Sequence, residues 1–570
     1  MAEEVWMLQT KKADFKQIGA RFQIDPVTAR IIRNRGIEGE AAIDRYLNGT
    51  LDDLYDPMLL KDMERAVSIL CEAVDTGKKI RIVGDYDIDG VCSTYILLQA
   101  FERLGSDVDF EIPDRIKDGY GINESIIEQA HADGVEVILT CDNGISAFHQ
   151  VELAKKYGMT VVITDHHEVP LDGEKEKIPP ADAVIDPKQA DCPYPFPEIC
   201  GAVVAYKLVQ VLYARRGVPQ MEWLDLLEFA AIATVGDVMK LQDENRILVK
   251  YGLKKMAQTK NLGLRRLAEK NNLDLGAITA YHIGFVIGPC LNAGGRLKTA
   301  KEALALLRAQ SEEEAERLAE ELKELNDTRK DMTEQGTEAA KLQVESWYQK
   351  DKVLVVFLPE CHESLAGIIA GRLREYYQKP AIVLTRGEEA VKGSGRSIDE
   401  YHMFKKLTEV SDLLLKFGGH PLAAGLSLEE KNIDEFRRRL NENAGLTEED
   451  FKAKVWIDVP MPVGYVTERL VRELSCLEPF GQGNEKPLFA EKSLRIRASR
   501  VLGRNRNVVK MTLEETDGHA IEALYFGDGT AFEEERAGRG EIDVVYYPDI
   551  NEYNGRKTLQ AVIRRYKFRG

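Results

Sequence analysis

The chain has 570 residues, of which 44% are hydrophobic and 30% charged, a composition typical of globular proteins. No apolar run approaches the roughly 20 residues that cross a membrane, and the first residues lack the apolar core of a signal peptide. Eight cysteines without a Cys-x-x-Cys pair argue against a zinc knuckle or a disulfide framework. We therefore expect a cytoplasmic protein of roughly three or four domains. The net charge of −18 argues against nucleic acid unless positive charge is concentrated locally.

The first 75 residues are polar, have a helical pattern and show no recognisable chemistry. From Lys79 onward, β-branched runs alternate with helical segments, which predicts a doubly wound parallel sheet. Strands are expected at 80–83, 108–112, 135–140 and 160–164, and helices at about 93–104, 124–132 and 146–157.

Three aspartates, Asp85, Asp87 and Asp89, follow the first of these strands. Such a cluster lies on a solvated turn or holds a hard cation. A calcium EF-hand also begins Asp-x-Asp-x-Asp-Gly, but it needs a glutamate at the twelfth position, where this chain has Ile96. The preceding strand also argues against an EF-hand, so a different cation site remains the stronger interpretation.

Two further strand ends carry metal-binding side chains. Asp142 follows the third strand, and Asp165, His166 and His167 follow the fourth. Ligands bind at the carboxyl ends of strands in such sheets, so we expect these groups to meet at one edge. Oxygen ligands with imidazoles and no thiolate favour Mn²⁺ or Mg²⁺, and two such ions sharing an aspartate are typical of phosphoryl transfer. Asp237 follows an apolar helix and taken alone would more often be a cap.

The second half of the chain contains a long charged helix, a second α/β region and a set of short strands. The helix is expected at about 300–347, and the α/β region includes strands at 351–358 and 381–384 around a helix at 365–377. Residues 392–397 are interpreted as a Gly-rich turn, in which Ser394, Arg396 and free N–H groups could meet a phosphate.

Five short strands after about residue 453 predict a small barrel such as an OB-fold. Residues 493–510 and 553–570 contain several arginines and lysines but no acidic residue, and the second stretch also carries Tyr553, Tyr566 and Phe568. Basic strands with aromatic side chains suit single-stranded nucleic acid. An ordinary basic sheet face is the alternative.

The segments GDYDIDG, CDNG, TDHH and TVGDV occur in the order seen in the DHH phosphoesterase superfamily. With IPDRIKDGYG, GPCLNAGGRL, GSGRS, FGGHPLAAG and LEPFGQGNEKPLF, the chain resembles the RecJ branch over about residues 15–568. The resemblance implies a monomeric 5′→3′ exonuclease that releases 5′-mononucleotides from single-stranded DNA in repair and recombination. It also implies two Mn²⁺ or Mg²⁺ ions, and a single-stranded-DNA-binding protein and a RecQ-type helicase as partners.

The resemblance also implies roles for individual residues. The metal ligands would be Asp87, Asp89, Asp142, His166 and Asp237, with Asp85 and His167 as further ligands or scissile-phosphate contacts and Asp165 orienting the imidazoles. Substrate contacts would be Arg115, Tyr120, Asn292, Arg296, His362, Ser394, Arg396 and His420. The chain departs from the family at Cys290, where arginine is usual.

The expected domains are a helical region at 1–75, a DHH catalytic domain at 76–300 and a connecting helix at 301–348. A second α/β domain at 349–450 and an OB-like domain at 451–570 complete the chain. Two other functions stay open: a DHH phosphodiesterase for short oligonucleotides or cyclic dinucleotides, and a non-catalytic replication scaffold. The basic terminal domain argues against the first, and the complete set of ligand positions argues against the second.

Overall fold

The computed structural model describes residues 4–553 and 555–569, which form two compact units. Unit 1 contains residues 54–240 and 244–453, and unit 2 contains residues 4–53, 241–243 and 454 onward. Residues expected to form one N-terminal helical region, 1–75, are thus divided between the units. No helix in the described part of the chain has the length and apolar character needed to span a membrane.

Unit 1 begins with a five-stranded sheet of order β3-β2-β4-β5-β8 in which every pair is parallel. The strands are β2 (Ile80–Val83), β3 (Val108–Glu111), β4 (Val137–Cys141), β5 (Thr160–Thr164) and β8 (Ala183–Ile185). The doubly wound parallel sheet is confirmed. The sequence pattern missed β8, because a three-residue strand is too short to show a period.

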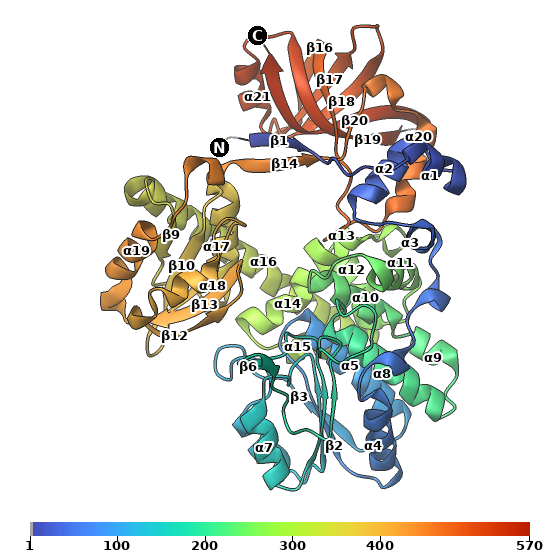
Figure 1. Ribbon diagram of the computed structural model, residues 1–570, viewed down its shortest axis with the longest axis vertical. Helices are drawn as coiled ribbons and strands as arrows, with labels where there is room; N and C mark the ends of the chain where they lie inside the picture. Colours follow the sequence, from blue (N-terminus) through green and yellow to red (C-terminus); the bar gives the residue numbers. More distant parts are fainter. Residues whose placement is uncertain (1–3, 554, 570) are drawn as a thin grey trace. The chain divides into compact units, whose positions relative to one another are not determined.

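Helices cover both faces of this sheet (Figure 1). They are α4 (Met63–Asp75), α5 (Ile88–Arg103) and α8 (Gly201–Arg215), with α6 (Glu124–Ala132) and α7 (Phe148–Lys156) over the core that includes Val83, Ile138 and Ile163. The helix expected from Ser93 begins five residues earlier, because the Asp87 side chain accepts hydrogen bonds from the N–H groups of Asp89 and Gly90 and caps it. Asp89 therefore lies in the first helical turn.

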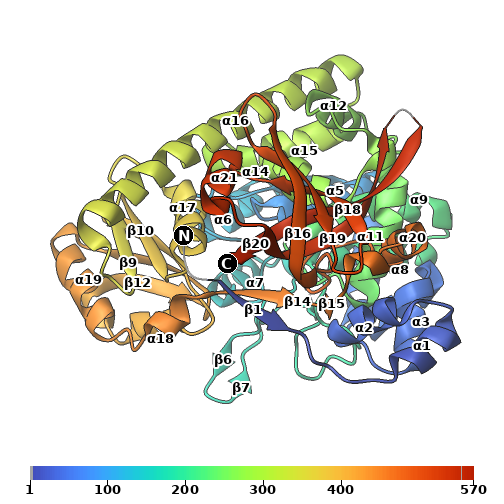
Figure 2. The same cartoon turned by 90° about the horizontal axis from the view of Figure 1, so that it is seen from above.

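A helical layer follows the first sheet of unit 1. Its helices are α9 (Gln220–Leu224), α10 (Leu227–Gly236), α11 (Asp243–Met256), α12 (Leu262–Lys270), α13 (Ala280–His282), a π-helical turn (Ile283–Ile287), α14 (Gly288–Leu297), α15 (Lys301–Arg308) and α16 (Glu312–Gln343). The long helix expected at 301–348 is interrupted before Ser311, whose hydroxyl caps α16. Figure 2 shows α16 as the long rod that leads to the second sheet of unit 1.

The second sheet has the order β12-β13-β11-β10-β9, and only β9 and β10 are parallel. Its strands are β9 (Leu354–Phe357), β10 (Ala381–Arg386), β11 (Val391–Arg396), β12 (Leu414–Gly419) and β13 (Ala423–Leu428). Three helices accompany them: α17 (Glu363–Tyr377), α18 (Met403–Thr408) and α19 (Ile433–Glu442).

The prediction of a Gly-rich turn at 392–397 was wrong, because residues 392–396 lie in β11, between β10 and β13. Their main chain is paired on both sides, so it cannot offer a row of free N–H groups to a phosphate. Gly393 is needed for packing rather than for a turn. A Cβ atom there would stand 2.6 Å from Leu384 and 3.0 Å from Leu426 on the neighbouring strands.

Gly393→Ala is expected to destabilise unit 1 by about 1–2 kcal/mol, because the added methyl group overpacks the sheet. Urea denaturation followed by circular dichroism measures the loss. Gly425→Ala on β13 is the matched control, since a Cβ atom at Gly425 meets no atom within 4 Å. Equal stability of the two variants would contradict this account of Gly393.

Unit 2 is a closed barrel of order β16-β17-β18-β20-β19, with β19 returning to β16 and β15 attached at the side. Its elements are β15 (Val459–Pro460), β16 (Phe489–Leu502), β17 (Val508–Glu514), β18 (Ala520–Phe526), α21 (Gly529–Arg536), β19 (Glu541–Tyr553) and β20 (Arg556–Arg569). The predicted OB-like barrel is confirmed. Beside it, β1 (Glu4–Leu8) pairs with β14 (Ala453–Ile457), and α20 (Glu468–Leu474) precedes β16.

Helices α1 (Phe15–Phe22), α2 (Pro26–Asn34) and α3 (Glu40–Asn48) complete unit 2. Ile31, Ile32 and Ile43 share one hydrophobic core with the barrel strands. At its edge, the Arg35 guanidinium donates two hydrogen bonds to the Asp458 carboxylate, at 2.7 and 3.1 Å. The N-terminal helices therefore form part of the barrel's core.

Candidate active site

The acidic segments meet where the strand order of the first sheet reverses. Strand β2 is followed by Asp85, Asp87 and Asp89, and the adjacent strand β4 is followed by Asp142. In a sheet of this order, the crevice between these two strand ends is the expected ligand site. Strand β5 adds the segment from Asp165 to His167 at the same edge.

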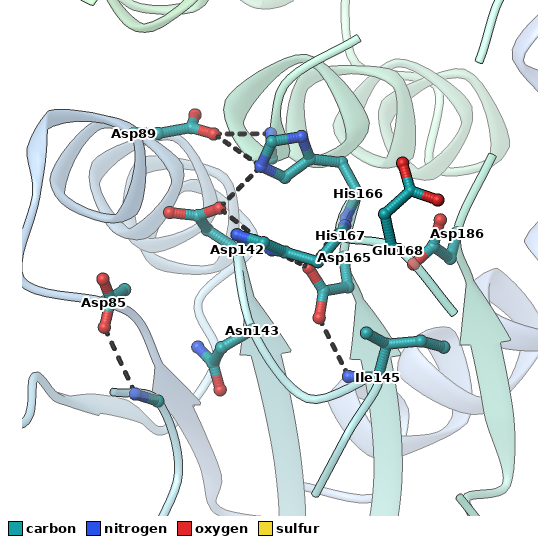
Figure 3. Close-up of polar contacts among 12 residues, drawn as sticks. Asp85, Asp89, Asp142, Asn143, Ile145, Asp165, His166, His167, Glu168 and Asp186 are labelled. Atoms are coloured by element: carbon teal, nitrogen blue, oxygen red, sulfur yellow. Dashed lines mark hydrogen bonds and ion pairs between the residues drawn. The ribbon is translucent and has the colours of Figure 1, made fainter. Parts of the chain in front are cut away.

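His166 lies at the centre of one group of ligand atoms (Figure 3). Its Nε2 atom is 3.1 Å from Asp142 Oδ1, 3.4 Å from Asp89 Oδ2 and 3.9 Å from Asp237 Oδ2. The Asp89 carboxylate is fixed by the N–H groups of Gly201 and Ala202 at the start of α8. The structure thus brings together Asp89, Asp142, His166 and Asp237, as the sequence predicted.

A second group lies next to the first. Asp85, Asp87 and Asp142 offer oxygen atoms within 4.8 Å of one another, and Asp142 also groups with His166 and His167 in the same way. Asp142 is therefore the carboxylate common to both groups. Its backbone is in the left-handed conformation, with a φ of 61°.

The electrostatics of this set suit a cation. Burial, together with the neighbouring carboxylates, raises the pKa of Asp87 and Asp142 and raises the pKa of Asp85 and Asp237 to about 8. Among the described residues, His166 Nδ1 is buried without a hydrogen-bond partner, and Asp142 Oδ1 has only its ion-pair contacts with the two imidazoles. Buried, mutually repelling carboxylates with an imidazole fit Mn²⁺ or Mg²⁺, which favour oxygen and imidazole ligands.

Asp165 organises the imidazoles from behind. Its carboxylate accepts hydrogen bonds from the N–H groups of Ile145 and His166 and lies 2.7 Å from His167 Nδ1. Burial opposes the charge on Asp165, but the bond from His167 outweighs it and lowers the pKa of Asp165. Burial likewise opposes the charged His167, but Asp165 raises the pKa of His167 to about 9. The Tyr120 hydroxyl donates to the Asp142 carbonyl at 2.6 Å.

Two residues near the site escaped the sequence analysis. The Asn143 amide donates to the carbonyls of Val83 and Cys141 and accepts from the Ile122 N–H, so it ties three strand-end loops together. Its place directly after Asp142 was the available signal. Asp186 follows the unpredicted strand β8, and burial, then Asp165, raises its pKa to about 7.

A cavity of about 670 Å³ opens next to the carboxylates, between the first part of unit 1 and the second sheet. Tyr86, the neighbour of Asp87, forms part of its wall. The wall also carries five cationic side chains, those of Arg115, Arg296, Lys392, Arg396 and Lys416, together with several hydroxyl groups, among them that of Ser394, and a single carboxylate, that of Glu363. Lys392 and Lys416 could not be predicted as cavity residues, because they lie on strands whose pairing the sequence pattern does not reveal.

The cavity's arginines are not neutralised by acids. Burial, then Arg115, lowers the pKa of Arg396, and burial with Arg115 and Arg329 lowers that of Arg296 to about 10. Arg296 Nη1 donates to the Ser364 carbonyl at 3.0 Å, and the Arg115 guanidinium lies 4.7 Å from the centre of the Tyr86 ring. Within the described ranges neither arginine forms an ion pair with a carboxylate, so the cavity attracts anions.

Four predicted substrate residues lie outside the cavity wall: Tyr120, Asn292, His362 and His420. Tyr120 contacts the carboxylate set, and Asn292 is half-buried on α14, about one turn before Arg296. His362 precedes α17 and lies 2.8 Å from the Ser364 hydroxyl, whereas His420 is close to Glu168, which also pairs with Lys188. Cys290 is buried and accepts a hydrogen bond from Asn326, away from the cavity.

The basic stretches of unit 2 are only partly available to a ligand. Arg497 pairs with Glu514, Lys510 with Glu522, and Arg569 with Asp543, whereas Arg495 and Arg500 are exposed on β16 without an ion pair among the described residues. Two of the aromatic side chains expected to contact a strand, Tyr566 and Phe568, are half-buried and pack against Phe532 of α21. The side chain of Tyr553 lies outside the described residues.

Three family models match the chain in order. They are the DHH family, N-terminal domain, at residues 79–234, the DHHA1 domain at 350–445 and the RecJ OB domain at 457–565.

Curated relatives match over almost the whole chain. The single-stranded-DNA-specific exonuclease RecJ of Bacillus subtilis (strain 168) is 36% identical, with 98% of this chain and 70% of the relative covered. That of Escherichia coli (strain K12) is 34% identical, with 95% and 96% covered. Among solved structures, RecJ of Thermus thermophilus in complex with Mn²⁺ superposes with a TM-score of 0.84 at 28% identity, over 99% of this chain and 79% of that one.

Proposed function

This chain belongs to the RecJ family, and from that premise we propose that it is a single-stranded-DNA-specific exonuclease. The proposal includes degradation from the 5′ end with release of 5′-mononucleotides. The observation that carries it is the position of Tyr86, which lines the cationic cavity, while Asp87, the next residue, belongs to the carboxylate set. A terminal phosphate in the cavity would therefore hold the adjoining phosphodiester near the carboxylates.

The carboxylate set would hold two Mn²⁺ or Mg²⁺ ions through Asp87, Asp89, Asp142, His166 and Asp237. Bound ions of this kind activate water and stabilise negative charge on phosphoryl oxygens. Asp142 is the proposed shared ligand, because it belongs to both groups of ligand atoms.

The chain's own residues would position the substrate around that set. Asp165 holds His167 through a 2.7 Å contact, which keeps the imidazole aimed at the carboxylates, where it can contact the scissile phosphate. Asp85, which is buried beside Asp87, is proposed to be a further metal ligand or a contact to the scissile phosphate. Arg296, Ser394 and Arg396 would bind the 5′-terminal phosphate, and Arg115, held against Tyr86, forms part of the same wall.

Recognition of an end follows from charge. A terminal phosphate carries more negative charge than an internal phosphodiester, and the planar guanidinium group bonds two of its oxygens at once. Several cations gathered around one cavity favour a terminal group over a strand that continues in both directions. This supports an exonuclease rather than an endonuclease.

The test uses a single-stranded oligonucleotide labelled at either end. With Mn²⁺, a 5′ label should appear first in a mononucleotide and a 3′ label in a descending ladder, and chelation of the metal should stop both. A circular single strand and a blunt duplex should resist. Cleavage of the circle would overturn the proposal, and metal-dependent hydrolysis of only the shortest oligonucleotides would favour the DHH phosphodiesterase alternative. Strand binding without hydrolysis would favour the scaffold.

Unit 2 is proposed to bind the strand through its exposed arginines on β16. Arg495→Ala and Arg500→Ala should each lower the slope of log affinity against log salt by about 0.7, the value for one lost phosphate contact on a single strand. Fluorescence anisotropy with a labelled oligonucleotide measures this slope. Arg497→Ala, on the same strand but paired with Glu514, is the control and should change the slope less. Identical slopes for all three variants would assign unit 2 another role.

The proposal keeps the family's expected surroundings. We propose that the protein is a cytoplasmic monomer. Its proposed partners are a single-stranded-DNA-binding protein and a RecQ-type helicase, because an exonuclease for single strands needs unwound DNA.

A further inference from the structure

Two aromatic rings stand exposed on one side of the carboxylate set. Tyr281 and Phe285 are 63% and 67% exposed, and their rings stack with centroids 4.7 Å apart and an interplanar angle of 28°. Tyr281 lies in α13 and Phe285 in the π-helical turn after it, a kind of turn that is frequent at functional sites. Ile283 and Ile287 are buried and anchor the turn. We call Tyr281 and Phe285 the aromatic platform.

The platform is attached to the helix that ends at Asp237. Gly284 precedes Phe285 in the sequence, and a Cβ atom there would stand 3.6 Å from Val235 of α10. Helix α10 ends at Gly236, and Asp237 and the exposed Val238 follow. The platform therefore lies beside the end of the carboxylate set that Asp237 occupies.

Helix α14 connects the platform to the cavity. Its first residue, Gly288, lies against Ile88 of α5, and near its other end Gly295 lies against the carbonyl of Tyr86. The helix thus passes along the Asp87–Asp89 segment, with the platform before it and Arg296 at its far end. A rise of 1.5 Å per residue over residues 285–296 separates the two by roughly 17 Å.

We propose that the aromatic platform stacks bases of the single strand on the 3′ side of the scissile phosphate. The inference rests on the proposed function: with the 5′ end bound by Arg296 and Arg396 and the reaction at the carboxylates, the remaining strand leaves past Asp237. Every base has a π face, so stacking on Tyr281 and Phe285 is independent of sequence. A duplex keeps its base faces covered, so the platform also contributes to the preference for single strands.

The test is the double variant Tyr281→Ala/Phe285→Ala. Its affinity for a single-stranded decanucleotide, measured in chelator so that no hydrolysis occurs, should fall about tenfold or more. The ratio of kcat/KM on the decanucleotide to kcat/KM on a 5′-phosphorylated trinucleotide should fall to a similar extent. A 2-aminopurine base placed downstream of the 5′ end should be quenched by the wild type and not by the variant.

Exchange of the two rings, Tyr281→Phe with Phe285→Tyr, should retain the wild-type values, whereas leucine at both positions should not. The leucine pair also keeps apolar contacts if the alanine pair fails to fold. Trp347→Ala is the control, because Trp347 is 69% exposed in the π-helical turn that follows α16 and should leave affinity unchanged.

The outcomes separate this inference from the proposed function. A wild type that does not degrade single strands overturns the function itself. An active wild type whose platform variants keep its affinity, length dependence and 2-aminopurine quenching overturns the platform alone. Equal rescue by leucine would mean that apolar bulk, rather than base stacking, is what the strand contacts, and would also overturn the proposal.

Discussion

Replacing Asp142 by alanine is expected to lower kcat on single-stranded DNA by at least about a thousandfold. Asp142 is the one carboxylate common to both groups of ligand atoms, so its loss affects both proposed ion sites. Single-turnover hydrolysis with Mn²⁺ measures the chemical step, and isothermal titration measures the loss of Mn²⁺ binding.

The protein should stay folded, because Asp142 contributes repulsion rather than attraction to the metal-free site. Its pKa is raised by burial and by Asp89, Asp87 and Asp85, so removing it relieves a cost. The melting temperature without metal is therefore expected to stay close to that of the wild type, because the relieved repulsion offsets the strain of alanine at a φ of 61°. Glu228→Gln is a matched control: this carboxylate is also buried, but it accepts a hydrogen bond from the Thr259 hydroxyl, between α11 and α12. Near-normal turnover by folded Asp142→Ala would refute the assignment.

Arg396→Ala is expected to reduce kcat/KM on a 5′-phosphorylated strand. The corresponding loss of transition-state stabilisation should be about 1.5–3 kcal/mol, the range for a hydrogen bond to a charged group. On a 5′-hydroxyl strand the same change should cost much less, since the group that Arg396 meets is absent. A double-mutant cycle across both proteins and both strand ends gives the coupling energy.

Two variants sharpen this cycle. Arg396→Lys keeps the charge without the planar fork and should fall between wild type and alanine. Arg374→Ala is the control. The Arg374 guanidinium is near enough to lower the pKa of Arg396, but it pairs with Glu375 and does not line the cavity. Its loss should therefore have the same effect on the 5′-phosphorylated and the 5′-hydroxyl strand. A coupling energy near zero for Arg396 would place end recognition elsewhere, with His420 and Arg296 as the next residues to test.

The sequence revealed β2, β4 and β5 because these strands are buried on both faces and are therefore rich in β-branched residues. Since parallel strands end at one edge, the positions of Asp87, Asp142 and His166 along the chain were enough to predict that they meet. The predicted start of α5 was wrong, because the helix begins where the Asp87 side chain accepts hydrogen bonds from the N–H groups of Asp89 and Gly90. Hydrophobic periodicity contains no information about such a cap.

Packing in the second sheet was not accessible from the sequence. The glycines of β11 suggested a turn, but Gly393 is there because Leu384 and Leu426 fill the space above it. The same missing pairing concealed Lys392 and Lys416 in the cavity wall. In unit 2, Tyr566 and Phe568 looked like surface rings until α21 supplied Phe532 as their partner.

Unit 2 draws its core from both ends of the chain, which matters while the protein is being made. Arg35 and its partner Asp458 are 423 residues apart. At a synthesis rate of about 5–20 residues per second, Asp458 is therefore made on the order of tens of seconds after Arg35. During that interval Ile31, Ile32 and Ile43 have no barrel to cover them, while the whole of unit 1 emerges and can fold. Helices α2 and α3 are thus expected to be the segment of the nascent chain most in need of a chaperone.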